Sequence, residues 1–125
     1  MKFLHVATMI KIYHNIHCSK SCNVLKLLEK HSAQFEVHDY LNDVPTKAQL
    51  VELLGQLGIT PFELIRKGES VFQEKFQNRQ LTDEQWIDVL LAHPILIERP
   101  IVVKDGVAVI GRPIEKVIEL IAIKP

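Results

Sequence analysis

The chain has 125 residues, of which 47% are hydrophobic and 24% charged, and its fifteen basic and fifteen acidic residues cancel. Such a composition is typical of one soluble globular domain, which at this length buries roughly two-thirds of its unfolded surface and needs no disulfide or metal for stability. The zero net charge argues against a general nucleic-acid binder, and no apolar run approaches the ~18 residues that cross a bilayer.

The first eight residues match no element that we can assign. They contain one lysine and no long apolar region, which makes them a poor secretory signal. We therefore expect residues 1–8 to be an extension, residues 9–125 to form a single domain, and the protein to be cytoplasmic. Cysteines stay reduced in that compartment, so two cysteines four residues apart favour redox or metal chemistry over a structural disulfide.

The first half of the chain predicts a strand, a helix and a second strand. A short β-rich run at residues 10–13 predicts the first strand. After a polar loop, apolar residues at helical spacing predict a helix that carries Cys22, Val24, Leu25, Leu27 and Leu28. Residues 35–39 alternate like a second strand, and such a β-α-β crossover implies that the two strands are parallel.

Helix signals dominate the middle of the chain. Thr46 and Thr82 each stand three residues before a glutamine, which is the capping-box pattern. Gly58 suits the end of the first of these helices, and Pro94 requires the second to end before it. Residues 60–63 carry a further start signal, with proline at the first helical position.

The end of the chain returns to strands. Residues 101–104 and 107–110 flank Asp105-Gly106, which is a strong signal for a two-residue hairpin turn. Pro113 then opens a final helix that carries Val117, Ile118 and Ile121. The sum is a thioredoxin-like α/β fold with a helical insertion between a β-α-β half and a β-β-α half.

Cys18 stands where the first strand gives way to the first helix. The free N–H groups and the dipole of a helix start favour an anion there, and they lower a thiol pKa from ~8.5 toward about 3.5–7.5. His14 and His17 lie close by in the sequence and could add positive charge. The alternative is a buried, inert cysteine, but polar neighbours favour a reactive thiol: His17, Ser19, Lys20 and Ser21.

Three arginines stand outside helix interiors or at helix ends: Arg66, Arg99 and Arg112. The planar fork of donors on a guanidinium group suits a tetrahedral oxyanion. For each arginine alone, however, solvated surface charge is the competing interpretation. Their placement in the sequence does not by itself make a site.

Four segments together carry a family resemblance. They are the loop at residues 13–21, Leu-Ile-Arg-Lys at 64–67, His-Pro-Ile-Leu-Ile-Glu-Arg-Pro-Ile-Val-Val at 93–103, and Gly-Arg-Pro at 111–113. In these segments the chain resembles the glutaredoxin-coupled arsenate reductases, the ArsC type of the ArsC/Spx thioredoxin-fold superfamily. The similarity runs in register from Met9 to the C-terminus, and the segment at 93–103 is its most specific part.

The resemblance implies a role for each matching residue. Cys18 is the nucleophile, His14 stabilises its thiolate, Pro100 follows a cis peptide bond, and the oxyanion is bound by Arg66, Arg99 and Arg112. In the implied reaction the thiolate attacks arsenic(V) and displaces water, glutathione attacks the adduct, glutaredoxin supplies further reduction, and arsenite leaves. Arsenate or a related oxyanion is then the substrate and glutathione the co-substrate, with no bound cofactor.

Two positions depart from the family pattern. Ile16 stands where the family has proline, so the fixed φ of proline is lost from the loop. Cys22 stands where the family has an arginine. It is a candidate resolving thiol, because residues four apart share a helix face. The alternative for Cys22 is core packing in one stripe with Leu25 and Leu28.

Other functions remain open at this point. The superfamily includes Spx-like transcription regulators, which bind RNA polymerase and sense oxidation through a Cys-x-x-Cys pair, and a thiol-redox protein without an oxyanion substrate is a third class. Four candidate metal ligands cluster at His14, His17, Cys18 and Cys22, but their spacing does not match that of structural zinc ligands. We therefore expect no metal.

Overall fold

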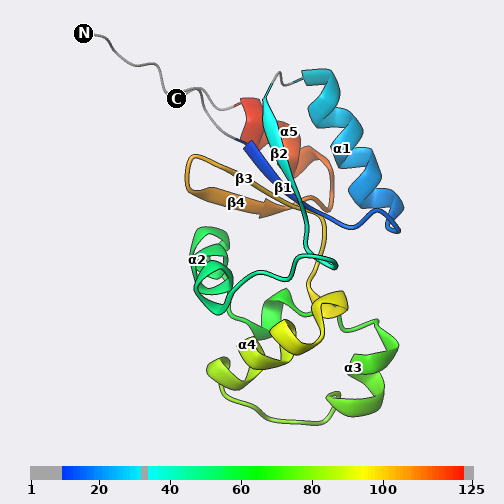
Figure 1. Cartoon of the computed structure of the whole chain (residues 1–125), viewed down its shortest axis with the longest axis vertical. Coiled ribbons are helices and arrows are strands. Elements are labelled where there is room, and N and C mark those ends of the chain that lie inside the picture. The colour runs from blue at the N-terminus through cyan, green and yellow to red at the C-terminus, as the bar shows by residue number, and fades with distance from the viewer. Residues whose placement is uncertain (1–9, 32–33, 123–125) are drawn as a thin grey trace, which may run out of the picture.

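The computed structural model describes residues 10–31 and 34–122, so the expected extension at residues 1–8 lies outside the described part (Figure 1). The strands and α-helices are β1 (Ile10–His14), α1 (Ser19–His31), β2 (Phe35–Asp39), α2 (Lys47–Leu57), α3 (Ser70–Lys75), α4 (Asp83–Ala92), β3 (Ile101–Lys104), β4 (Val107–Ile110) and α5 (Glu115–Ala122). Two 3-10 turns, η1 (Phe62–Leu64) and η2 (Pro94–Leu96), lie before α3 and after α4. This order confirms the predicted thioredoxin-like fold with its helical insertion.

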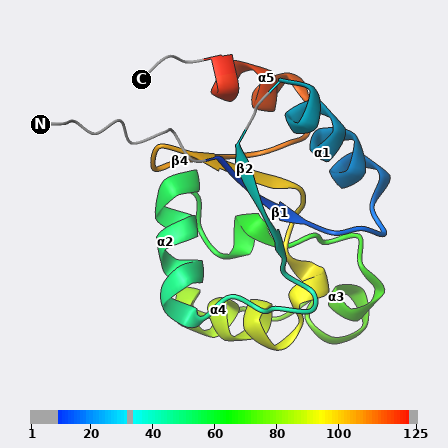
Figure 2. The same cartoon turned by 45° about the horizontal axis from the view of Figure 1, so that its top comes forward.

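A mixed four-stranded sheet organises the molecule in the order β2-β1-β3-β4. β1 runs parallel to β2, as the crossover predicted, whereas β3 is antiparallel to both β1 and β4. Helices α1 and α5 cover one face of the sheet, and the helical block (α2, α3 and α4 with η1 and η2) packs on the other side (Figures 1 and 2). The strands therefore lie between two helical layers of unequal size.

Each side of the sheet has its own hydrophobic cluster. The cluster under α1 and α5 includes Ile12 and Leu28, and the cluster under the helical block includes Tyr13, Trp86 and Leu90. Successive side chains of a strand point to opposite faces, so the neighbours Ile12 and Tyr13 belong to different clusters. The sheet thus connects two cores.

Local sequence signals explain where several elements start and stop. Thr46 and Thr82 each accept a hydrogen bond from the N–H of the glutamine three residues later, and both capping boxes are complete. Gly58 ends α2 in the left-handed region, at φ 70°. Asp105 (φ 52°) and Gly106 (φ 78°) make the β3–β4 turn with two positive φ angles, as a type I′ hairpin requires.

Some expectations need correction. Residues 60–63 begin only the short turn η1, because the chain becomes extended at Ile65 and forms a β-bridge to Ile97. The buried face of α1 consists of Ser21, Val24 and Leu28, so Cys22 lies beside the core and is only half-buried. Helix α3 has no side-chain cap and was not signalled in the sequence. In the described part of the chain, no helix has the length and apolar character to span a membrane.

Candidate functional site

Several strand ends meet at one edge of the sheet. The parallel strands β1 and β2 end side by side, with His14 paired to Asp39. β4 ends beside the start of β3, where the N–H of Gly111 donates to the carbonyl of Pro100 (2.8 Å). β3 also pairs with β1, so the segments after β1 and β4 and the segment before β3 converge. These three segments carry Cys18, Arg112 and Arg99.

Cys18 directly precedes α1. Its carbonyl accepts the N–H of Cys22 (3.0 Å), and its own N–H donates to the carbonyl of Asn15 (3.0 Å). The side-chain oxygen of Asn15 accepts the N–H of His17 (2.8 Å), which holds the loop between β1 and α1 in shape. The thiol is therefore fixed beside the free N–H groups of the first helical turn.

The pKa of the Cys18 thiol is lowered to about 7. Burial is the largest single effect, and it acts in the opposite direction because it disfavours the thiolate. The backbone N–H groups of Ser21 and Lys20, the side chain of Arg99 and the charge of Arg112 together outweigh burial. The lowered pKa favours the thiolate at neutral pH, and the thiolate is the nucleophilic form.

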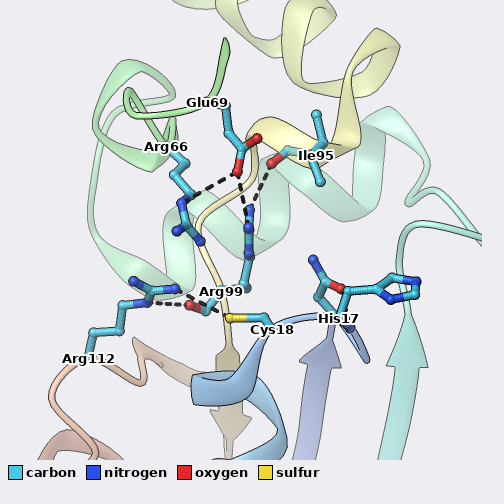
Figure 3. Close-up of polar contacts among 8 residues, drawn as sticks. His17, Cys18, Arg66, Glu69, Ile95, Arg99 and Arg112 are labelled. Carbon is cyan, nitrogen blue, oxygen red and sulfur yellow. Dashed lines mark hydrogen bonds and ion pairs between the residues drawn. The ribbon is translucent and has the colours of Figure 1, made fainter. Parts of the chain in front are cut away.

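Arg112 lies directly against the sulfur (Figure 3). Its Nη2 is 3.5 Å from Sγ of Cys18, and its Nε donates to the backbone carbonyl of Arg99 (2.8 Å). The second contact fixes the guanidinium group in place beside the thiol. Arg112 therefore connects the helix start at Cys18 to the chain that leads into β3.

Arg99 is buried, with 6% of its surface exposed, and it is held at both ends of its guanidinium group. Nη1 donates to the carbonyl of Ile95 (2.9 Å), and Nη2 donates to the carboxylate of Glu69 (3.1 Å). Burial works against the charge, but the Glu69 hydrogen bond and nearby negative groups outweigh it and raise the pKa of Arg99. The same Glu69 oxygen lies 3.6 Å from Nε of Arg66. Glu69 thus holds both arginines from the side opposite Cys18 (Figure 3).

Two donors of these arginines are left without partners. Nη1 of Arg66 and Nε of Arg99 are buried and make no hydrogen bond among the described residues. A buried donor without a partner costs about 1–3 kcal/mol, so native proteins rarely keep one without a reason. With Arg112 on the sulfur, the arrangement is that of a site for an anion next to a nucleophilic thiol.

His14 is hydrogen-bonded to the first turn of α1. A hydrogen bond of 2.7 Å joins its Nδ1 to the hydroxyl of Ser21, which also accepts the N–H of Asn15 (3.0 Å). Burial lowers the pKa of His14, although the charge of Asp39 opposes this shift. This direction disfavours a positive charge on His14, and its part in stabilising the thiolate stays a prediction. His17 is exposed, and its ring points away from the sulfur (Figure 3).

Two supporting residues were not predicted from the sequence. Ser21 contributes a backbone N–H to the Cys18 thiolate and a buried hydroxyl to the loop. Its position three residues after Cys18, in the first helical turn, is the signal that could have identified it. Glu69 follows Arg66 by three residues, and this spacing alone did not predict a shared partner with Arg99.

Cys22 and Pro100 complete the set of predicted residues. Sγ of Cys22 donates a weak hydrogen bond to the carbonyl of Ile16 (3.4 Å), and the two clusters described above do not include Cys22. Both cysteines are free thiols. The Arg99–Pro100 peptide bond is cis. Among residues 10–31 and 34–122, no group of three or more histidine, cysteine or acidic side chains could hold a metal ion.

Comparison with known proteins gives consistent matches. The model of the ArsC family matches residues 13–120. An arsenate reductase of Escherichia coli is 37% identical over 113 residues, which cover 90% of this chain and 80% of that protein. The solved structure of an arsenate reductase from Vibrio cholerae has a TM-score of 0.84 and 40% identity, covering 91% of this chain and 98% of the other. A putative arsenate reductase from Yersinia pestis has a TM-score of 0.83 and 42% identity, covering 88% and 98%.

Proposed function

The chain belongs to the ArsC family, and we therefore propose that it is an arsenate reductase, an oxidoreductase that converts arsenate to arsenite through an adduct on Cys18. The observation that carries this proposal is the Cys18 thiol, with a pKa of about 7, in contact with Arg112. A thiol of lowered pKa is an activated nucleophile at neutral pH. The neighbouring guanidinium groups supply the charge that an arsenate anion requires.

Each arginine has a distinct part in the proposed reaction. Arg112 contacts both the thiol and the incoming anion, and the free donors of Arg66 and Arg99 bind arsenate oxygens. The Cys18 thiolate then attacks arsenic(V), and one arsenate oxygen leaves as water after protonation. The positive charges stabilise the negative charge on the adduct more strongly in this partly buried site than they would in water.

Glutathione and glutaredoxin supply the electrons in our proposal. Reduction of arsenic(V) to arsenic(III) takes two electrons, so arsenate and two thiols give arsenite, one disulfide and water. A cleft lies beside Arg112, which contacts the thiol, and its lining includes Lys20, Asn23 and Glu115. The positive groups Lys20 and Arg112 suit the carboxylates of glutathione, which makes this cleft the proposed approach of the co-substrate.

His14 acts indirectly in this scheme. It holds Ser21, and Ser21 presents its N–H to the thiolate, so His14 supports the anion through the loop and the first helical turn. Glu69 is a positioning residue, because it touches the arginines and lies away from the sulfur.

Arsenite formation from arsenate, with glutathione and glutaredoxin present, tests the proposal. We expect the wild-type protein to produce arsenite over many turnovers and Cys18→Ser to produce none above the background. Lys75→Gln, an exposed change on α3 outside the site, is the matched control and should retain the wild-type rate. A wild-type protein that makes no arsenite under these conditions would refute the substrate assignment.

A further inference from the structure

Tyr40 is a fully buried residue whose hydroxyl has no hydrogen-bond partner in the described chain. Its ring packs in the cluster under the helical block. Buried tyrosine hydroxyls normally find a partner, because burying an unpaired polar group is unfavourable. The packing of the ring therefore accounts for the burial of Tyr40, but it does not account for the unpaired hydroxyl.

The topology places Tyr40 at the same sheet edge as the thiol. His14 at the end of β1 pairs with Asp39 at the end of the parallel strand β2. The residue that follows β1 is Asn15, whose carbonyl accepts the N–H of Cys18, and the residue that follows β2 is Tyr40. Tyr40 therefore leaves the sheet beside the loop that carries the nucleophile.

The groups that act on the hydroxyl belong to the same site. Burial raises the pKa of Tyr40 to about 12, while the charge of Arg99, a hydrogen-bond contribution from the side chain of Asn15 and the charge of Arg66 act in the opposite direction. An amide N–H can only donate to the hydroxyl, so the hydroxyl's own proton is still without an acceptor among the described residues. The Cys18 thiolate also raises the pKa of Tyr40. The hydroxyl consequently keeps its proton throughout the neutral range, so it is a hydrogen-bond donor there and cannot serve as a base.

The unpaired donors of this region have a common chemistry. Nη1 of Arg66, Nε of Arg99 and the hydroxyl of Tyr40 are three of the buried polar atoms without a partner in the described residues. All three can donate, so together they suit an oxygen-rich anion and not a cation. The fourth such atom, Oε1 of Glu98, is an acceptor and has no part in this inference.

We propose that the hydroxyl of Tyr40 is a ligand of the bound oxyanion and donates a hydrogen bond to one of its oxygens beside Cys18. This inference rests on the proposed function, because it assigns a further binding residue to the same site. Tyr40 adds a directional donor without adding charge. It therefore favours a tetrahedral oxyanion that presents an oxygen at this point, whereas the arginines attract anions of any shape.

Removal of the hydroxyl alone tests the proposal. Tyr40→Phe keeps the packed ring and deletes the unpaired polar atom. Because that atom has no partner in the free protein, we expect the melting temperature to stay the same or rise. Hydrogen bonds to charged groups are worth about 1.5–3 kcal/mol, so we expect arsenate to bind at least about tenfold more weakly.

The chain offers a matched control in its other tyrosine. Tyr13 is also buried, but it lies on β1, where its ring stacks on His38 at 4.9 Å. Tyr13→Phe should leave arsenate affinity at the wild-type value. The affinity is measured as the sodium arsenate concentration that halves the rate of Cys18 alkylation by iodoacetamide, with mass spectrometry of the Cys18 peptide as the readout.

Each outcome separates the two proposals. Loss of protection in Tyr40→Phe, with an undiminished melting temperature, supports Tyr40 as a ligand. Equal protection of wild type and Tyr40→Phe overturns the role of Tyr40 and leaves the proposed function standing. A melting temperature far below that of Tyr13→Phe also overturns it, since the hydroxyl would then support the fold. If arsenate protects Cys18 in none of the proteins, the proposed substrate falls and the ligand role falls with it.

Discussion

The acidity of the Cys18 thiol depends on groups that come from opposite ends of the chain. Two backbone N–H groups belong to the first turn of α1, whereas Arg99 and Arg112 flank the β3–β4 hairpin. Burial opposes all of them. The reactivity of this residue is therefore a net result, and removal of a single favourable group should be measurable.

The pH dependence of Cys18 alkylation should change when Arg112 is removed. In the wild-type protein the rate should reach half of its plateau near pH 7, where the thiol ionises. Arg112→Gln removes a positive charge 3.5 Å from the sulfur, so its midpoint should move to higher pH. Arg79→Gln, an exposed change far along the chain, should keep the wild-type midpoint. Identical curves for wild type and Arg112→Gln would contradict the assigned contact.

The same ionisation should make stability depend on pH. The pKa of Cys18 falls from the ordinary cysteine value of ~8.5 to about 7 in the folded protein. A depressed pKa contributes stability that is fully present above pH 9 and is lost as the pH falls through 7. The free energy of unfolding, measured by denaturation, should therefore rise in the wild type relative to Cys18→Ser as the pH is raised from 7 to 9. A constant difference across this window would count against a folded-state thiolate.

Cys22 should form a disulfide with Cys18 if it is a resolving thiol. Glutathione disulfide would first react with the Cys18 thiolate and release one glutathione, and the Cys22 thiol would then attack the Cys18 sulfur and release the second. Cα atoms four residues apart in a helix lie about 6 Å from each other, within the range that a disulfide spans. Because the bond would distort the first turn of α1, it should be readily reduced.

Intact-mass measurement after treatment with glutathione disulfide decides this prediction. We expect a loss of two hydrogens in the wild type and a stable glutathione adduct in Cys22→Ser. A wild-type protein that keeps the adduct on Cys18 while Cys22 stays free would show that Cys22 does not resolve it. Its weak hydrogen bond to Ile16 would then be its role in the loop.

At the level of single elements, the loop between β1 and α1 depends on one buried hydroxyl. Ser21→Ala removes the partner of both His14 and the N–H of Asn15, and each group is buried. We expect the free energy of unfolding to fall by about 1–3 kcal/mol, measured by urea denaturation. Ser19→Ala, an exposed change in the same turn, should alter it by less than about 0.5 kcal/mol. Equal effects of the two variants would contradict the importance of the buried network.

The elements were predictable from the sequence where their signals are local. The two capping boxes, the stop at Gly58 and the Asp105-Gly106 turn depend on neighbouring residues, and all were found as predicted. The start signal at residues 60–63 failed because Ile65 pairs with a residue far away in the sequence. The position of Tyr40 beside the nucleophile loop and the contacts of Glu69 could not be predicted for the same reason, since they depend on strand register and on the packing of the helical block.

The whole domain should unfold as one unit, because both hydrophobic clusters use the same strands. Leu28 and Leu90 are fully buried on opposite sides of the sheet. Each change to alanine should cost about 2–5 kcal/mol. In Leu28→Ala, the fluorescence of Trp86, which lies in the other cluster, should report the same lowered midpoint as far-UV circular dichroism. Separate midpoints for the two signals would show that the helical block and the sheet unfold independently.

The distance in sequence between Cys18 and Arg112, 94 residues, has a consequence for the protein during its synthesis. Cys18 leaves the ribosome early, whereas Arg99 and Arg112 follow only with the last strands. Until they arrive, the thiol has an unfinished site around it and ionises closer to the ordinary range of a free cysteine, ~8.5. Oxidation of cysteine proceeds through the thiolate, so the nascent chain exposes a less vulnerable thiol than the finished enzyme does. Completion of the fold and activation of the nucleophile are in this way the same event.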